Sequence, residues 1–95
     1  MFVYKFYVGV PDHIGYVDTT NKVDAALYNN GIEGATIYFT DGLWRGQQEK
    51  SLVLEIIAHN GNLLPADIHD IRADLRIAFE QEYIMVTQHE AIQIT

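Results

Sequence analysis

The order in which the hydrophobic period changes along the chain most restricts its possible fold. Residues 2–10, 35–40, 51–57 and 83–87 are short runs rich in β-branched and aromatic residues, as is typical of strands. Residues 19–31 and 65–81 repeat apolar residues every three or four positions, as is typical of helices packed on one side. The sequence therefore predicts the order strand, helix, strand, strand, helix, strand.

Residues at the ends of these segments support the same order. Thr19 or Thr20 can cap the first helix, and Gly31 suits its end. Pro65 is well suited to the first position of the second helix. Residues 89–95 alternate enough that we also expect them to add a short edge strand.

The βαββαβ order is that of the ferredoxin-like α+β fold, in which one antiparallel sheet carries two helices on a single face. A chain of 95 residues rarely divides into two cores, so one domain over residues 1–95 is expected. The uncovered face of such a sheet is usually polar. The composition of the strands therefore indicates whether that face stays open to solvent.

Apolar residues are predicted on both faces of this sheet. If Leu52, Leu54 and Ile56 face the helices, then Val53 and Ile57 lie on the opposite side. Uncovered apolar area of this extent usually contacts another subunit, although scattered apolar surface residues are common. We therefore expect an oligomer. The apolar residues expected on the uncovered face are Val3, Tyr7, Val53 and Ile57.

Composition limits the classes of partner. Thirteen acidic and six basic residues give a formal charge of −7, whereas binding to nucleic acid requires a basic face. The absence of cysteine excludes disulfides, thiolate metal sites and thiol catalysis. No apolar run approaches the ~20 residues of a membrane-spanning helix, and no signal-peptide pattern is present. We expect a soluble, cytoplasmic domain that binds neither nucleic acid nor membrane.

Motifs for metal, cofactor or nucleophile chemistry are missing from the sequence. His13, His59, His69 and His89 are far apart and share neither HxxH nor HExxH spacing. Ser51 has no GxSxG context, and no Walker or Rossmann glycine loop occurs. We therefore expect no metal and no cofactor.

The segment that joins the second and third strands carries the best candidate site. Its expected turn holds the only tryptophan, Trp44, beside Arg45, and Glu49 follows eleven residues after Tyr38. Tyr38 and Glu49 could lie near each other on the uncovered face, depending on strand register. Such a group suits a cation. Alternatively, Tyr38 is an interface residue, Glu49 a solvated strand end and Trp44 a packing cap.

The stretch TDGLWRGQQEKSLVLEI, followed by LRIAFEQEYIMVTQ, resembles the small phage-encoded S-adenosylmethionine lyases, the anti-restriction SAMase family. The resemblance runs from about Ala35 to Gln88 and rests on a Thr-Gly-aromatic-Arg turn with a Glu-Lys step after it. Family members are described as trimers of PII-like subunits that hold substrate between neighbours. The resemblance implies a PII-like trimer in the cytoplasm, that of the host cell if the chain is phage-encoded. The founding member has a long C-terminal extension that this sequence lacks.

The chemistry implied by the resemblance is an intramolecular displacement without metal or cofactor. The carboxylate of S-adenosylmethionine attacks its own methionyl chain and releases methylthioadenosine and homoserine lactone; the reaction has also been written as hydrolysis to homoserine. Through the resemblance, Glu49 and Tyr38 are the catalytic candidates. Glu49 would hold the amino group or face the cation, and Tyr38 would orient the reacting end. The substrate-binding candidates are Trp44, Arg45 and Thr40.

Two other functions remain open from the sequence. A PII-like sensor that binds an adenine nucleotide without turnover is favoured by the order of elements and by GATIYF after the first helix. It is disfavoured because Arg45 and Lys50 are the only basic residues near the hairpin that could hold phosphates. The second alternative is a structural or inhibitory phage-type protein that acts through its uncovered sheet face.

Overall fold

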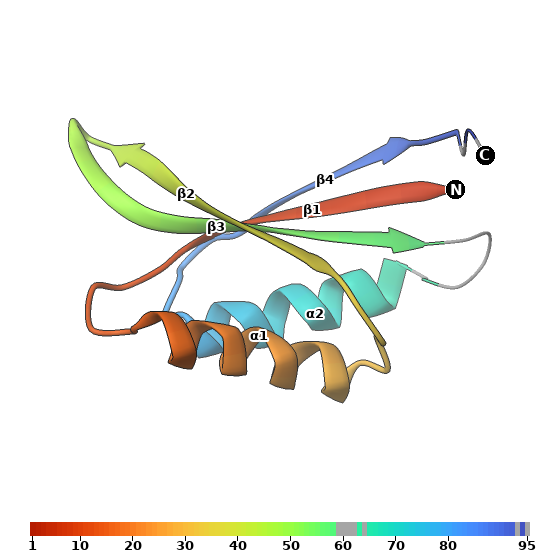
Figure 1. Ribbon diagram of the computed structural model, residues 1–95, viewed down its shortest axis with the longest axis horizontal. Coiled ribbons are helices and arrows are strands. Elements are labelled where there is room, and N and C mark those ends of the chain that lie inside the picture. The colour runs from red at the N-terminus through yellow and green to blue at the C-terminus, as the bar shows by residue number, and fades with distance from the viewer. Residues whose placement is uncertain (59–62, 64, 93, 95) are drawn as a thin grey trace.

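The computed structural model describes residues 1–58, 63, 65–92 and 94. A four-stranded antiparallel sheet carries two helices on one face (Figure 1). The elements are β1 (Phe2–Gly9), α1 (Tyr16–Asn29), β2 (Thr36–Trp44), β3 (Gln47–Ala58), α2 (Pro65–Ala78) and β4 (Met85–Glu90). The strand order is β2-β3-β1-β4. This arrangement confirms the ferredoxin-like βαββαβ fold predicted from the sequence.

The core lies between the sheet and the helices. Leu52 and Leu54 of β3 are 0% exposed and Ile56 is 2% exposed, as expected for the residues that face the helices. The helices contribute fully buried residues such as Leu75 of α2. Burial of each aliphatic side chain of this size contributes roughly 1.5–3 kcal/mol relative to exposure. The alternation along β3 therefore fixes which face of the strand is available for a site.

The first helix begins earlier than the sequence predicts. Its first residue is Tyr16, with Gly15 in the N-cap position and no side-chain cap, so the prediction of a cap at Thr19 or Thr20 is wrong. Thr19 instead lies one turn inside α1 and is 2% exposed. Ile14, also 2% exposed, anchors the preceding loop in the core and thereby sets the start of the helix without a polar cap. Gly31 has φ 71° just after the helix, as suits its predicted role at this end.

The C-terminal elements differ from the prediction by a few residues. The second helix begins at Pro65 as predicted but ends at Ala78 rather than at position 81. Glu80 follows two residues later with a left-handed φ of 55°, which does not continue a helix. The last strand covers Met85–Glu90 instead of 83–87. Of the described residues in the 89–95 tail, 89 and 90 belong to β4 whereas 91, 92 and 94 lie in no strand.

The β2–β3 hairpin is longer than the sequence predicts. Pairing runs from Thr36↔Glu55 to Trp44↔Gln47, so most of residues 41–50, expected to be a connection, is strand. The turn consists of Arg45 and Gly46 alone, with φ values of 50° and 78°. Two central residues with positive φ are the requirement of a type I′ hairpin turn. Trp44 is therefore the last residue of β2 and not part of the turn.

Gly46→Ala is expected to destabilise this hairpin, because a Cβ at a φ of 78° clashes with the adjacent backbone. The strain is about 1–2 kcal/mol per left-handed residue. In a domain of this size the midpoint of thermal unfolding should fall by about 4–8 °C for each kcal/mol. The matched control is Gly34→Ala, since an added Cβ there meets nothing within 4 Å and the φ is not left-handed. Equal midpoints for the two variants would contradict the assigned turn.

Candidate functional site

The outer face of the sheet, which is the face opposite the helices, is apolar across its middle. One row of neighbouring residues crosses all the strands, and three of its members are 38–47% exposed. This finding agrees with the expectation of an uncovered apolar face, except that Val3, which was predicted to be uncovered, is only 6% exposed. The row consists of Tyr38, Val53, Tyr7 and Met85.

Tyr38 and Glu49 lie on this same outer face but do not meet within one chain. Tyr38 is paired with Val53, whereas Glu49 is paired with Gly42. Positions 49 and 53 are four residues apart on β3, which corresponds to about 13 Å at the usual rise of a strand. The register thus places both side chains on one face but far apart along it. They could act on one substrate only if a second subunit supplied one of them or if the ligand spanned the distance.

The surroundings of Glu49 form a small polar surface on the hairpin. Gly42 is opposite Glu49, so no side chain of β2 stands directly beside the carboxylate. The next outer-face residues of β2 on either side are Thr40 and Trp44. The Thr40 hydroxyl lies 2.6 Å from the hydroxyl of Ser51. We call these five residues, Thr40, Gly42, Trp44, Glu49 and Ser51, the Glu49 strip.

The aromatic end of the Glu49 strip already holds a cation. The Arg45 guanidinium lies over the Trp44 ring, 5.3 Å from its centroid, although Trp44 remains 61% exposed. A carboxylate, an aromatic face and a pair of hydroxyls on one surface provide contacts for an ammonium or sulfonium group. All the site candidates from the sequence therefore lie on one hairpin, with Arg45 in its turn.

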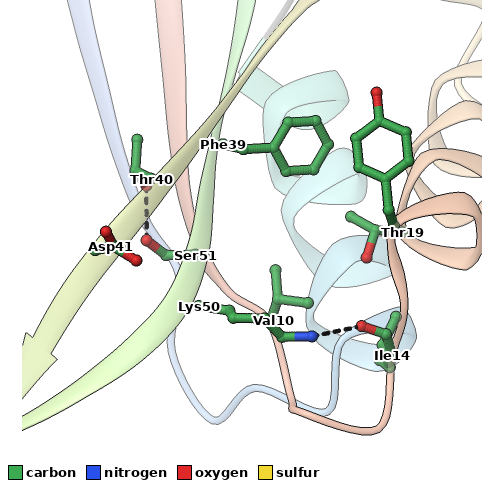
Figure 2. Close-up of a pocket in the computed structure, with 9 residues that line it drawn as sticks. Val10, Ile14, Thr19, Phe39, Thr40, Asp41, Lys50 and Ser51 are labelled. Carbon is green, nitrogen blue, oxygen red and sulfur yellow. Dashed lines mark hydrogen bonds between the residues drawn. The ribbon is translucent and has the colours of Figure 1, made fainter.

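A cavity of about 300 Å³ lies on the opposite side of the same hairpin, between β2–β3 and the start of α1 (Figure 2). Val10 and Ile14 form its apolar part and are 8% and 2% exposed. The rings of Tyr16 and Phe39 flank it, with centroids 4.8 Å apart. The Lys50 ammonium donates hydrogen bonds to the backbone oxygen of Ile14 at 2.8 Å and of Asp12 at 3.4 Å.

This cavity was not predicted from the sequence. In the structure Tyr16 is 69% exposed and Phe39 is 49% exposed. The two rings meet because α1 begins at Tyr16, which places this side chain beside Phe39 of β2. An aromatic residue directly after Gly15, at the base of a helix, is the signal that could have indicated it.

The histidines do not gather around the site. His13 Nε2 lies 2.8 Å from a carboxylate oxygen of Glu80, at the exposed ends of two loops. In the described part of the chain, no group of three or more His, Asp or Glu side chains could hold a metal ion. His59 lies outside the described residues. No helix among those described is long and apolar enough to cross a membrane.

Comparison with known proteins finds solved structures of similar fold, three of which are described below, whereas no family model and no curated protein matches the chain. A phage SAM lyase in the apo state superposes with a TM-score of 0.71 at 24% identity, over 93% of this chain and 78% of that one. The divalent ion tolerance protein CutA1 from Ehrlichia chaffeensis gives 0.53 at 12% identity, covering 98% and 84%. The periplasmic divalent cation tolerance protein CutA from Archaeoglobus fulgidus gives 0.56 at 9% identity, covering 100% and 88%. At these identities the similarities establish the fold alone, which is ferredoxin-like and of the kind found in the PII-like CutA proteins.

Proposed function

We propose that this protein is an S-adenosylmethionine lyase that releases methylthioadenosine and homoserine lactone. The observation that carries the proposal is the similarity of fold to a phage SAM lyase, at a TM-score of 0.71 over 93% of the chain. The Glu49 strip adds support, because it combines a carboxylate and an aromatic ring on one face. The physiological role that we propose is phage anti-restriction through removal of S-adenosylmethionine in the host cytoplasm.

The proposed reaction balances without help from an acid, a base or a metal. A carboxylate oxygen of the substrate forms a bond to the γ-carbon of its own methionyl chain. The bond from that carbon to the sulfonium sulfur breaks, and its electron pair remains on sulfur. One negative and one positive charge disappear together, so a dry site that holds the chain folded favours the step. The protein therefore has to bind, orient and exclude water.

Each candidate residue has a role that matches its chemistry. The Glu49 carboxylate accepts hydrogen bonds from the substrate ammonium and keeps it away from the attacking carboxylate. The Tyr38 hydroxyl donates a hydrogen bond that orients the reacting end. The Trp44 ring packs against the sulfonium side of the substrate, where cation–π attraction contributes about 0.5–2 kcal/mol. Arg45 and Thr40 are proposed to bind substrate at the two ends of the strip.

We propose that a trimer completes the site between neighbouring subunits. In a single chain the Glu49 strip faces solvent, which would hydrate the charges of the substrate. Leu43 and Trp44, on opposite faces of the hairpin, are 82% and 61% exposed. Exposed apolar side chains of this size are suited to contact with neighbouring subunits. Because Tyr38 and Glu49 of one chain are about 13 Å apart along the hairpin, we propose that Glu49 of one subunit and Tyr38 of its neighbour together hold the methionyl part of the substrate.

The alternative function, a PII-like sensor that binds an adenine nucleotide such as ATP without turnover, is less well supported by the contacts on the hairpin. Of the two nearby basic residues, Lys50 already donates hydrogen bonds to two backbone oxygens. Arg45 would then have to bind the phosphates largely by itself.

Trp44 provides a direct test between these two functions because it is the only tryptophan in the chain. Its emission is expected to change and saturate on titration with methylthioadenosine, since the ligand displaces water from a ring that is 61% exposed. ATP at the same concentrations should leave the emission nearly unchanged. A saturating response to ATP without one to methylthioadenosine would support the sensor and contradict the lyase.

A further inference from the structure

The cavity behind the hairpin has a polar group without a protein partner. Thr19 is 2% exposed, and its hydroxyl makes no hydrogen bond to any residue that the structure describes. In the described chain, every fully enclosed polar side-chain atom has a hydrogen-bond partner. The Thr19 oxygen has none, so it is not fully enclosed, and Thr19 lines the cavity. Figure 2 shows the Thr19 side chain pointing from α1 toward the hairpin. A buried hydroxyl of this kind usually has a partner, in protein, water or ligand.

The remaining walls are suited to a flat aromatic ring. The Tyr16 and Phe39 rings are inclined by 37° and leave much of their surface exposed, whereas Val10 and Ile14 are apolar and buried. Aromatic side chains with free faces in a concave site are typical stacking partners of nucleobases. A volume of about 300 Å³ lies at the lower limit of ligand pockets, so it suits one ring system rather than a whole cofactor.

The polar groups favour a ring that contains both acceptors and a donor. The Lys50 ammonium has a proton to donate beyond its two backbone contacts, and the Thr19 hydroxyl can donate or accept. The Asp41 carboxylate, opposite Lys50 in the register, can accept. Adenine offers ring nitrogens to the donors and an amino group to the acceptors, whereas a purely apolar ring would leave the buried Thr19 hydroxyl without a partner.

We propose that this cavity binds the adenine ring of adenosine-type ligands, the substrate and the methylthioadenosine product among them. This assignment rests on the proposed function, since it names where the base of that substrate is held. The cavity and the Glu49 strip lie on opposite faces of the hairpin, and β2 is the edge strand of the sheet. The ribose and its substituent therefore leave the cavity past β2, toward the face that carries Glu49.

Two substitutions test the assignment through calorimetric binding of methylthioadenosine. Thr19→Val keeps the shape and removes the hydroxyl; loss of one hydrogen bond should weaken binding about 3- to 10-fold. Its unfolding temperature should not fall, because the hydroxyl has no protein partner to lose. Tyr16→Ala removes a stacking surface and should weaken binding about tenfold or more. Tyr28→Ala, on the same helix and 83% exposed, is the matched control and should bind as the wild type does.

The outcomes separate this assignment from the proposed function. If the wild type cleaves S-adenosylmethionine and binds its product, but Thr19→Val and Tyr16→Ala bind the product equally well, then only the adenine site is wrong. If the wild type neither cleaves the substrate nor binds methylthioadenosine, both proposals are overturned. A drop in unfolding temperature of Thr19→Val with unchanged binding would assign the hydroxyl to the fold and also overturn the site.

Discussion

Glu49→Gln is expected to lower the turnover of S-adenosylmethionine about ten- to a hundred-fold while the protein stays folded and assembled. The amide keeps the shape of the side chain but loses the charge that would hold the substrate ammonium. A hydrogen bond to a charged group is worth roughly 1.5–3 kcal/mol, which gives a change of this size. Greater losses are expected if the attacking carboxylate also loses its alignment.

The measurement is methylthioadenosine release, followed by chromatography. Glu82→Gln is the matched control, because Glu82 is an exposed glutamate in the loop between α2 and β4 and is not part of the hairpin. It should retain wild-type turnover. Tyr38→Phe should lie between the two, because it removes a neutral hydrogen bond and keeps the ring. Wild-type turnover in Glu49→Gln would remove this carboxylate from the mechanism.

Ile57→Lys is expected to convert the assembled protein into folded monomers. Ile57 is 53% exposed on the outer face, paired with Val3, which is 6% exposed. If this face is the contact between subunits, the substitution would bury an ammonium without a partner in the contact, at a cost of several kcal/mol. In a monomer the same ammonium stays in water, so the fold itself should survive.

Sedimentation of the wild type should give about three times the 10.8 kDa mass of one chain, and that of Ile57→Lys about one. The same change at Ile77, which is 79% exposed on α2, is the matched control and should leave the assembly intact. Turnover should fall with assembly, since the site is proposed to lie between subunits. A wild type that sediments as a monomer at micromolar concentrations would contradict the shared site.

The sheet and its two faces were predictable because alternation in β1 and β3 is a strong local signal. Leu52 and Leu54 face the core and Val53 lies on the outer face, as a period of two requires. The ends of elements were less predictable. The helix start at Tyr16 depends on Ile14 packing in the core, a tertiary contact that no capping residue indicates.

The hairpin illustrates why the site was only partly predictable. Arginine is uncommon at positive φ, so nothing in the sequence indicated a type I′ turn at Arg45 and Gly46. The strand pairing was therefore predicted to end too early. The register, which determines that Glu49 is opposite Gly42 and not close to Tyr38, follows from that turn. The residue types of the candidate site were therefore accessible from sequence, whereas their spacing and the cavity behind them required the structure.

Incubation of the purified protein with S-adenosylmethionine tests the central claim most directly. The products are followed by chromatography with mass detection, without added metal or cofactor. Methylthioadenosine and homoserine lactone are expected in equal amounts, formed at a rate proportional to protein concentration and reduced in Glu49→Gln. Intact S-adenosylmethionine after prolonged incubation with folded, assembled protein would contradict the assignment of this protein as a lyase.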